Sequence, residues 1–176
     1  VSDCDYDQSG VILKWIYGEL NAPAERPNGR FLIFDQSPYA EAGNGLSSEA
    51  VVYNPAACTG QNGCRLHIAL HGCEQSRDQV GMTFTEGSGF ARWADTNRLV
   101  ILFPQVEASI LNPKACWDWW GYTGKDFLTK DAPQIAVIWR MVERLARGNK
   151  TAKASAAFLE RRRTSHVLPN DGGAAD

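Results

Sequence analysis

The sequence predicts an α/β fold built on a parallel pair of strands joined by a helix. Residues 65–71 form an apolar run of strand length, and residues 86–96 carry a helical stripe of apolar side chains. Residues 99–103 are a continuous run of β-forming side chains stopped by Pro104, which is typical of a strand buried on both faces. Strand, helix and strand in this order make a βαβ unit.

Three further elements are expected in the first third of the chain. A helix over about 10–20 can be capped by Asp7 or Ser9, and short strands are expected at 31–34 and 50–55. The helix is expected to pack through apolar positions spaced three and four apart: Ile12, Leu13, Ile16, Tyr17 and Leu20.

A last helix is expected over 132–147, with Asp131 as its cap and Pro133 in its first turn. Its expected apolar face consists of Ile135, Ile138, Trp139, Val142 and Leu145. Residues 1–147 are therefore predicted to form one domain. Residues 148–176 are predicted to be a polar, disordered tail.

The strand at 65–71 ends in His71-Gly72-Cys73, which we call the oxyanion turn. Gly72 lets the backbone leave the strand sharply. In esterases of the α/β-hydrolase class, a His-Gly turn after a central strand helps to supply a backbone N–H that stabilises the tetrahedral intermediate. The candidate donor here is the amide of Cys73, and an ordinary strand-ending turn is the alternative.

Composition excludes several classes of partner. The chain has 176 residues and a net charge of -2, with no block of basic residues over the part expected to be ordered, which argues against nucleic acid or an anionic membrane surface. No apolar run approaches the ~20 residues of a membrane span. His67, His71 and His166 form no metal-binding motif, so neither a metal nor another cofactor is expected.

The five cysteines indicate disulfides and an oxidising, extracellular setting. Cys58 and Cys64 bracket a polar loop that a disulfide can close. Cys73 and Cys116 are candidates for a second bridge, which would leave Cys4 over.

No convincing nucleophile is found in the sequence. Gly45-Leu46-Ser47 resembles the start of a G-x-S-x-G elbow, but Glu49 replaces the second glycine, so Ser47 is interpreted as a loop serine. In an α/β-hydrolase the helix at 132–147 would be followed by the nucleophile strand. We therefore expect either truncation or a circularly permuted chain whose nucleophile, acid and base precede Val1, and the leftover Cys4 favours the second.

Residues 116–124, the aromatic loop, hold three of the six tryptophans. One interpretation is a loop packed over the core by its own aromatic rings. The other is a substrate platform in which Trp117, Trp119 and Trp120 offer rigid apolar area beside the site.

Several segments, in one consistent order, resemble the C-terminal half of extracellular poly(3-hydroxybutyrate) depolymerases of the circularly permuted type. The resemblance covers roughly residues 1–145 and is carried by Cys4-Asp5-Tyr6-Asp7, Trp15-Ile16-Tyr17-Gly18, Phe34-Asp35-Gln36-Ser37, residues 64–73, Trp93-Ala94-Asp95-Thr96-Asn97 and residues 116–122. It implies a secreted serine hydrolase that cuts a hydrophobic polyester through a Ser-His-Asp triad.

The resemblance places the triad before Val1 and leaves this chain the oxyanion turn, with Cys73 as donor, and a substrate wall of Trp117, Trp119 and Trp120. His71 is then part of the turn rather than the general base. The expected fold is thus a partial α/β-hydrolase without its nucleophile-bearing half. We expect a monomer that is inactive as a fragment. The alternatives are a secreted acetyl or feruloyl esterase and a non-catalytic polymer-binding pseudoenzyme.

Overall fold

A computed structural model describes residues 5–60 and 63–147, so the predicted tail at 148–176 and Cys4 lie outside the described residues. The centre of the fold is a four-stranded mixed sheet of order β1-β2-β4-β3. Its strands are β1 (Arg30–Asp35), β2 (Glu49–Asn54), β3 (Arg65–Ile68) and β4 (Leu99–Phe103). β2 is antiparallel to both β1 and β4, whereas β3 runs parallel to β4, which confirms the expected parallel pair.

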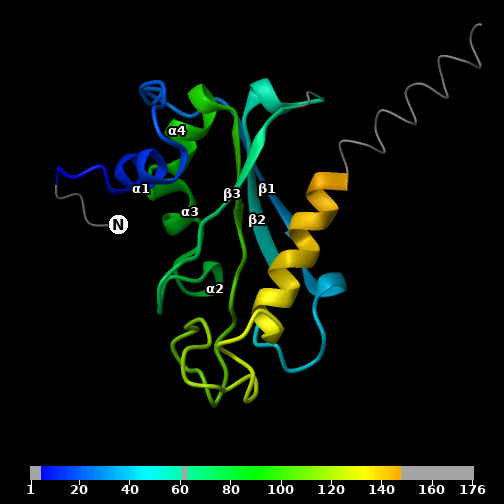
Figure 1. The fold of residues 1–176 in the computed structure, drawn as a ribbon. Coiled ribbons are helices and arrows are strands. Elements are labelled where there is room, and N and C mark those ends of the chain that lie inside the picture. The colour runs from blue at the N-terminus through cyan, green and yellow to red at the C-terminus, as the bar shows by residue number, and fades with distance from the viewer. Residues whose placement is uncertain (1–4, 61–62, 148–176) are drawn as a thin grey trace, which may run out of the picture.

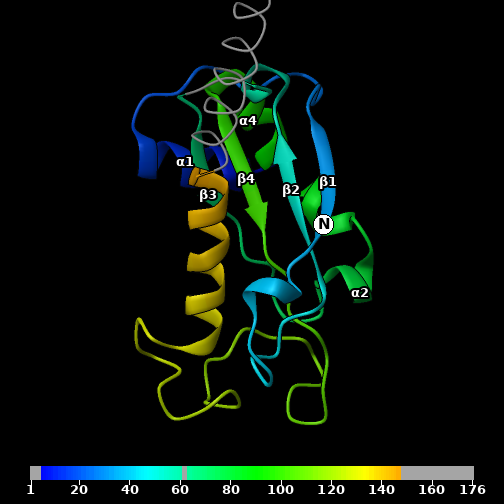
Figure 2. The ribbon, with the colours of Figure 1, turned by 90° about the vertical axis from the view of Figure 1, so that its right-hand side faces the viewer.

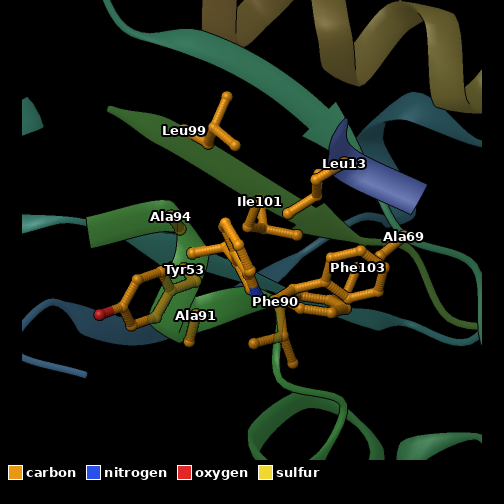
Figure 3. Packing of buried hydrophobic residues seen from close by; sticks show 11 residues of the cluster. Leu13, Tyr53, Ala69, Phe90, Ala91, Ala94, Leu99, Ile101 and Phe103 are labelled. Carbon is orange, nitrogen blue, oxygen red and sulfur yellow. The ribbon is translucent and has the colours of Figure 1, made fainter. Parts of the chain in front are cut away.

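Helices cover both faces of the sheet (Figures 1 and 2). One face carries α1 (Gln8–Tyr17), α3 (Thr83–Gly87) and α4 (Phe90–Asn97), and the other carries a helix at residues 133–147. Side chains of the sheet meet α1 and α4 in the larger apolar core, where Tyr53, Ile101 and Phe103 are fully buried (Figure 3). Short helical turns also occur at η1 (Ser37–Tyr39), η2 (Ala56–Cys58) and α2 (Arg77–Val80).

Helix α1 begins and ends as its sequence dictates. The Asp7 carboxylate accepts a hydrogen bond from the Gly10 amide at 2.8 Å, so Asp7 rather than Ser9 is the cap. The helix ends before Gly18, whose positive φ of 79° is a backbone conformation that glycine adopts without strain. Asp7 also accepts from the indole N–H of Trp93 at 2.8 Å, which ties the start of α1 to α4.

The predicted apolar faces of two helices are only partly right. In α1, Leu13 is fully buried, but Ile16 is 54% exposed and Ile12 is 36% exposed. In the helix at 133–147 the most buried side chains are two others, Val137 and Met141. The apolar stripe on each helix is wider than the surface that the sheet offers to it. The surplus side chains therefore face outwards: Trp15, Ile135 and Trp139.

Two helix starts also differ from prediction. The expected helix at 86–96 is divided because Gly89 has a φ of 85°, which breaks the helical path, so α4 begins at Phe90. The last helix begins at residue 133, where the carbonyl of Ala132 accepts from the Ala136 amide at 2.9 Å. The Asp131 carboxylate instead pairs with Lys130.

β3 and β4 end at the same edge of the sheet because they run in the same direction. The strand predicted over 65–71 stops at Ile68, although the Ala69 amide still donates to Leu102 at 2.9 Å. The chain that follows β3, together with residues 104–132 after β4, gathers at this end, which is lowest in Figures 1 and 2. Ligand sites of open α/β sheets lie at such an edge.

Candidate active site

The oxyanion turn lies at the surface, and the amide of its last residue, Cys73, is unused among the described residues. Cys73 is exposed, whereas the preceding His71 is only 2% exposed. The Gly72 amide donates to the Gln75 side chain at 3.0 Å, and the Gly72 carbonyl accepts from the Gln75 amide at 3.3 Å. Within residues 5–60 and 63–147, the Cys73 N–H has no hydrogen-bond acceptor. It is therefore free to donate to a bound group.

The buried side chain of His71 has a hydrogen-bond partner at each of its two ring nitrogens. Its Nε2 accepts from the Val106 amide at 3.2 Å, and its Nδ1 lies 2.7 Å from the Gly72 carbonyl. The ring packs against Phe84 and Trp117. Burial lowers the pKa of His71 below its ordinary value, against a smaller opposing effect of the Gly72 carbonyl, so the imidazole is neutral near pH 7.

Residues just beyond the turn are fixed to the end of β4. The Gln105 side chain is 2% exposed and accepts from the Arg77 amide at 2.7 Å. The Gln36 side chain, also fully buried, donates to the Gln105 carbonyl at 2.7 Å. Because these amides are buried and satisfied, they hold the segment after the turn in one place.

A disulfide joins the oxyanion turn to the aromatic loop. Cys73 and Cys116 are bonded, with their Cα atoms 4.3 Å apart, and Cys58 and Cys64 form the second bridge, so both expected pairs are confirmed. Next to the first bridge, the indole N–H of Trp117 donates to the His71 carbonyl at 3.0 Å. The two segments thus form one unit.

The aromatic loop is organised around the Asp118 carboxylate. One oxygen accepts the backbone amides of residues 120–122, and the other accepts both the amide and the hydroxyl of Thr123, at 2.6–3.2 Å. Burial alone would raise the pKa of Asp118, but hydrogen bonds from Thr123, Gly121 and Tyr122 outweigh it, so the pKa lies below its ordinary value. The Asn112 side chain donates to the Cys116 carbonyl at 2.8 Å. The Gln134 side chain accepts from the Asp118 amide at 2.9 Å and donates to the Tyr122 hydroxyl at 2.7 Å, so both halves of the loop are anchored.

The three candidate wall tryptophans have different surroundings. Trp119 is 70% exposed and Trp120 is 40% exposed, and their rings meet edge to face at 5.2 Å. Trp117 is half-buried, and its indole N–H is engaged by the turn. Trp119 and Trp120 therefore present free apolar area, whereas Trp117 packs against His71.

Other candidate chemistry is limited in the part of the chain that the structure describes. Ser47 is 7% exposed and its hydroxyl donates to Asp78 at 3.2 Å. No group of three or more His, Cys, Asp or Glu side chains that could hold a metal ion occurs among the described residues. Likewise, none of the described helices has the length and apolar character needed to span a bilayer.

Comparison with known proteins identifies the type of domain. The sequence is 40% identical over 152 residues to the poly(3-hydroxybutyrate) depolymerase of Delftia acidovorans and 38% identical over 161 residues to the polyhydroxybutyrate depolymerase of Talaromyces funiculosus. Each match covers 84% of this chain. This is a domain of the poly(3-hydroxybutyrate) depolymerase type. No family model matches the sequence.

Solved structures of such depolymerases have the same fold. The crystal structure of the Penicillium funiculosum enzyme matches with a TM-score of 0.74 at 38% identity. A serine-to-alanine variant of a PHB depolymerase complexed with an R3HB trimer matches with a TM-score of 0.75 at 39% identity. Each match covers 78% of this chain. The mixed sheet with helices on both faces is accordingly of the α/β-hydrolase type.

The chain spans less than half of these relatives. It covers 30% of the Delftia protein, 47% of the Talaromyces protein and 47% of each solved chain.

Sequence reasoning missed the residues that hold the site in place. Gln105 gives no signal beyond its position one residue after Pro104 at the end of a buried strand. Asp118 had a usable signal, because an Asp followed by Gly and Thr within five residues can accept several turn amides.

Proposed function

We propose that this chain supplies the oxyanion-stabilising half of the active site in a secreted serine esterase that hydrolyses polyesters of the poly(3-hydroxybutyrate) type. The Cys73 N–H carries the proposal: it belongs to an exposed residue and donates to no described group, and a tetrahedral ester intermediate needs donors that are held in place in advance. The homologues' names and the R3HB trimer bound to one of them support a polyester substrate. The two disulfides fit an oxidising, extracellular setting.

The proposed chemistry follows from this donor. A serine from the remainder of the active site attacks the ester carbonyl carbon while a histidine base, oriented by an aspartate, takes its proton. The carbonyl oxygen becomes negatively charged and accepts a hydrogen bond from the Cys73 N–H. The intermediate then collapses, the alcohol end of the polymer leaves with the proton, and water releases the acyl end. Trp119 and Trp120 contact the apolar polymer chain beside the reacting ester.

The remainder of the active site is proposed to pair with the free edge of β3. In the described sheet, β3 has a neighbour only on the β4 side. Ile68 is 36% exposed and Leu70 is 47% exposed. A strand placed parallel to β3 would end beside Cys73, which is where the nucleophile must stand, whereas a strand beside β1 would not.

We further propose a circularly permuted order, in which the nucleophile, acid and base precede Val1. The coding sequence upstream of Val1 tests this order directly. A G-x-S-x-G motif is expected there, and its absence would favour the non-catalytic, polymer-binding alternative, which the 70% exposure of Trp119 also supports.

The function is tested with the full-length secreted protein on emulsified poly(3-hydroxybutyrate), on soluble 3-hydroxybutyrate oligomers, and on acetyl and feruloyl esters. We expect turnover of the first two and little of the others. Preference for the acetyl or feruloyl esters would replace the polyester with a plant-wall substrate. The 176-residue chain by itself should show no turnover, and a burst of ester hydrolysis from it would contradict the half-site proposal.

A further inference from the structure

We infer that His71 is a positioning residue that fixes the direction in which the Cys73 N–H points, through a hydrogen bond from its Nδ1–H to the Gly72 carbonyl. This inference rests on the proposed function, because it assigns to a buried side chain the orientation of the oxyanion donor. His71 contacts neither the substrate nor the reacting atoms in this role.

The protonation of the ring follows from its partners. A backbone N–H can only donate, so the Nε2 that receives the Val106 amide at 3.2 Å must be unprotonated. A neutral imidazole then carries its hydrogen on Nδ1, which lies 2.7 Å from the Gly72 carbonyl. The Val106 amide therefore selects the form of His71 that can donate to Gly72.

The Gly72 carbonyl and the Cys73 N–H belong to one peptide group. None of the described peptide bonds is cis, so the C=O and N–H vectors of this group point in opposite directions. Because the carbonyl is drawn towards the buried imidazole, the N–H must point away from it, on the exposed side of the turn. The Gln75 amide, which donates to the same carbonyl at 3.3 Å, supports this orientation from within the turn.

Without the donor on His71, the peptide can rotate. Gly72 has no side chain to restrict its ψ angle, and rotation of this one peptide would replace the N–H with a carbonyl oxygen facing the oxyanion. The loss would affect the transition state, in which charge develops, far more than substrate binding. The expected signature is a fall in kcat at constant KM.

The experiment compares three variants of the full-length protein on a soluble 3-hydroxybutyrate oligomer. His71→Asn keeps a donor near the Nδ1 position, His71→Gln places its amide group near Nε2 instead of Nδ1, and His71→Leu keeps neither. We expect kcat to fall about 100-fold in the Gln and Leu variants, as when one oxyanion donor is lost, and less than about 10-fold in the Asn variant. KM should stay within about twofold in all three.

His67→Asn is the matched control. His67 is a second buried histidine, at 7% exposure, whose Nδ1 lies 3.2 Å from the Tyr17 hydroxyl on α1. Its replacement should lower Tm but leave kcat within about twofold. Equal loss of kcat in the Asn and Gln variants of His71, loss that simply follows Tm, or a rise in KM instead would overturn the inference.

A spectroscopic measurement does not depend on the folding of variants. The 15N chemical shifts of His71 in the wild-type protein should report hydrogen on Nδ1 and none on Nε2 at pH 7.5. The opposite tautomer would overturn the inference even if the enzyme is active. By contrast, a wild-type protein with the expected tautomer but without ester turnover would refute the proposed function and leave the tautomer assignment standing.

Discussion

The oxyanion turn and the aromatic loop lie side by side, yet they are held by opposite kinds of interaction. The turn rests on a buried, neutral imidazole and on backbone bonds, and its Cys73 N–H has no acceptor among the described residues. The loop is wound around a charged carboxylate, Asp118, and its rings remain exposed. In the proposed site, the first arrangement would set the direction of the Cys73 N–H, whereas the second holds the backbone of the loop and leaves its rings exposed.

Removing the disulfide that joins the two regions should have the largest effect. Replacing Cys73 and Cys116 with Ala opens a connection of sequence separation 43, against 6 for Cys58 and Cys64. Loop-closure entropy predicts a loss of about 4 kcal/mol in the free energy of unfolding for the first pair and about 2.4 kcal/mol for the second. Denaturation by urea measures both, and equal losses would contradict the expected dependence on loop length.

The loop should depend on its carboxylate. Asp118→Ala removes the acceptor of all five hydrogen bonds, and we expect a loss of about 2 kcal/mol in the free energy of unfolding. The near-UV circular dichroism of the tryptophans should fall with it. Asp126→Ala, an exposed carboxylate in the connection that follows the loop, is the control and should change neither signal.

Exposed rings should matter for adsorption rather than for stability. Trp119→Ala should weaken binding to poly(3-hydroxybutyrate) film about 10-fold, with little change in Tm. Trp15→Ala is the matched control, because Trp15 is 90% exposed but lies on α1, away from the loop. If both variants lose adsorption equally, the loop is not a specific contact.

The last and smallest expected effect is the pH dependence of the free energy of unfolding, which should differ between the histidines and Asp118. Burial lowers the pKa of His67 and His71 below 6.5, so below about pH 6.5 the unfolded chain binds protons that the folded chain does not. The free energy of unfolding should therefore fall on acidification, by at most about 1.4 kcal/mol per pH unit for each histidine, until the lowered pKa is passed.

The contribution of Asp118 to stability changes at lower pH. Its pKa is below 3.8 in the folded chain, so its contribution is present above that pH and is lost as the pH falls further. Urea titrations between pH 8 and pH 3 should thus show two separate losses. A single loss confined to pH values below 4 would mean that neither histidine is buried in its neutral form.

The strands and the turn could be predicted from the sequence because their signals are local. The four apolar runs became β1 to β4, and the cysteine spacings gave both disulfides. The bonds that position the site could not be predicted, because Gln36, Gln105 and Val106 reach across the fold to partners distant in sequence. Outward-facing Trp139 could not be foreseen either, since a periodic pattern does not state how much of a helix face its sheet will cover.

The disulfide between Cys73 and Cys116 also determines how force can pass between the aromatic loop and the oxyanion turn. An enzyme that adsorbs to a solid polymer experiences sideways tension whenever the polymer chain slides or detaches. Tension on the indoles of the loop would reach residue 116 and then residue 73 through this covalent linkage. If the proposed function holds, the Cys73 amide and the rings of the loop would therefore shift together, and the distance between them would be kept under load.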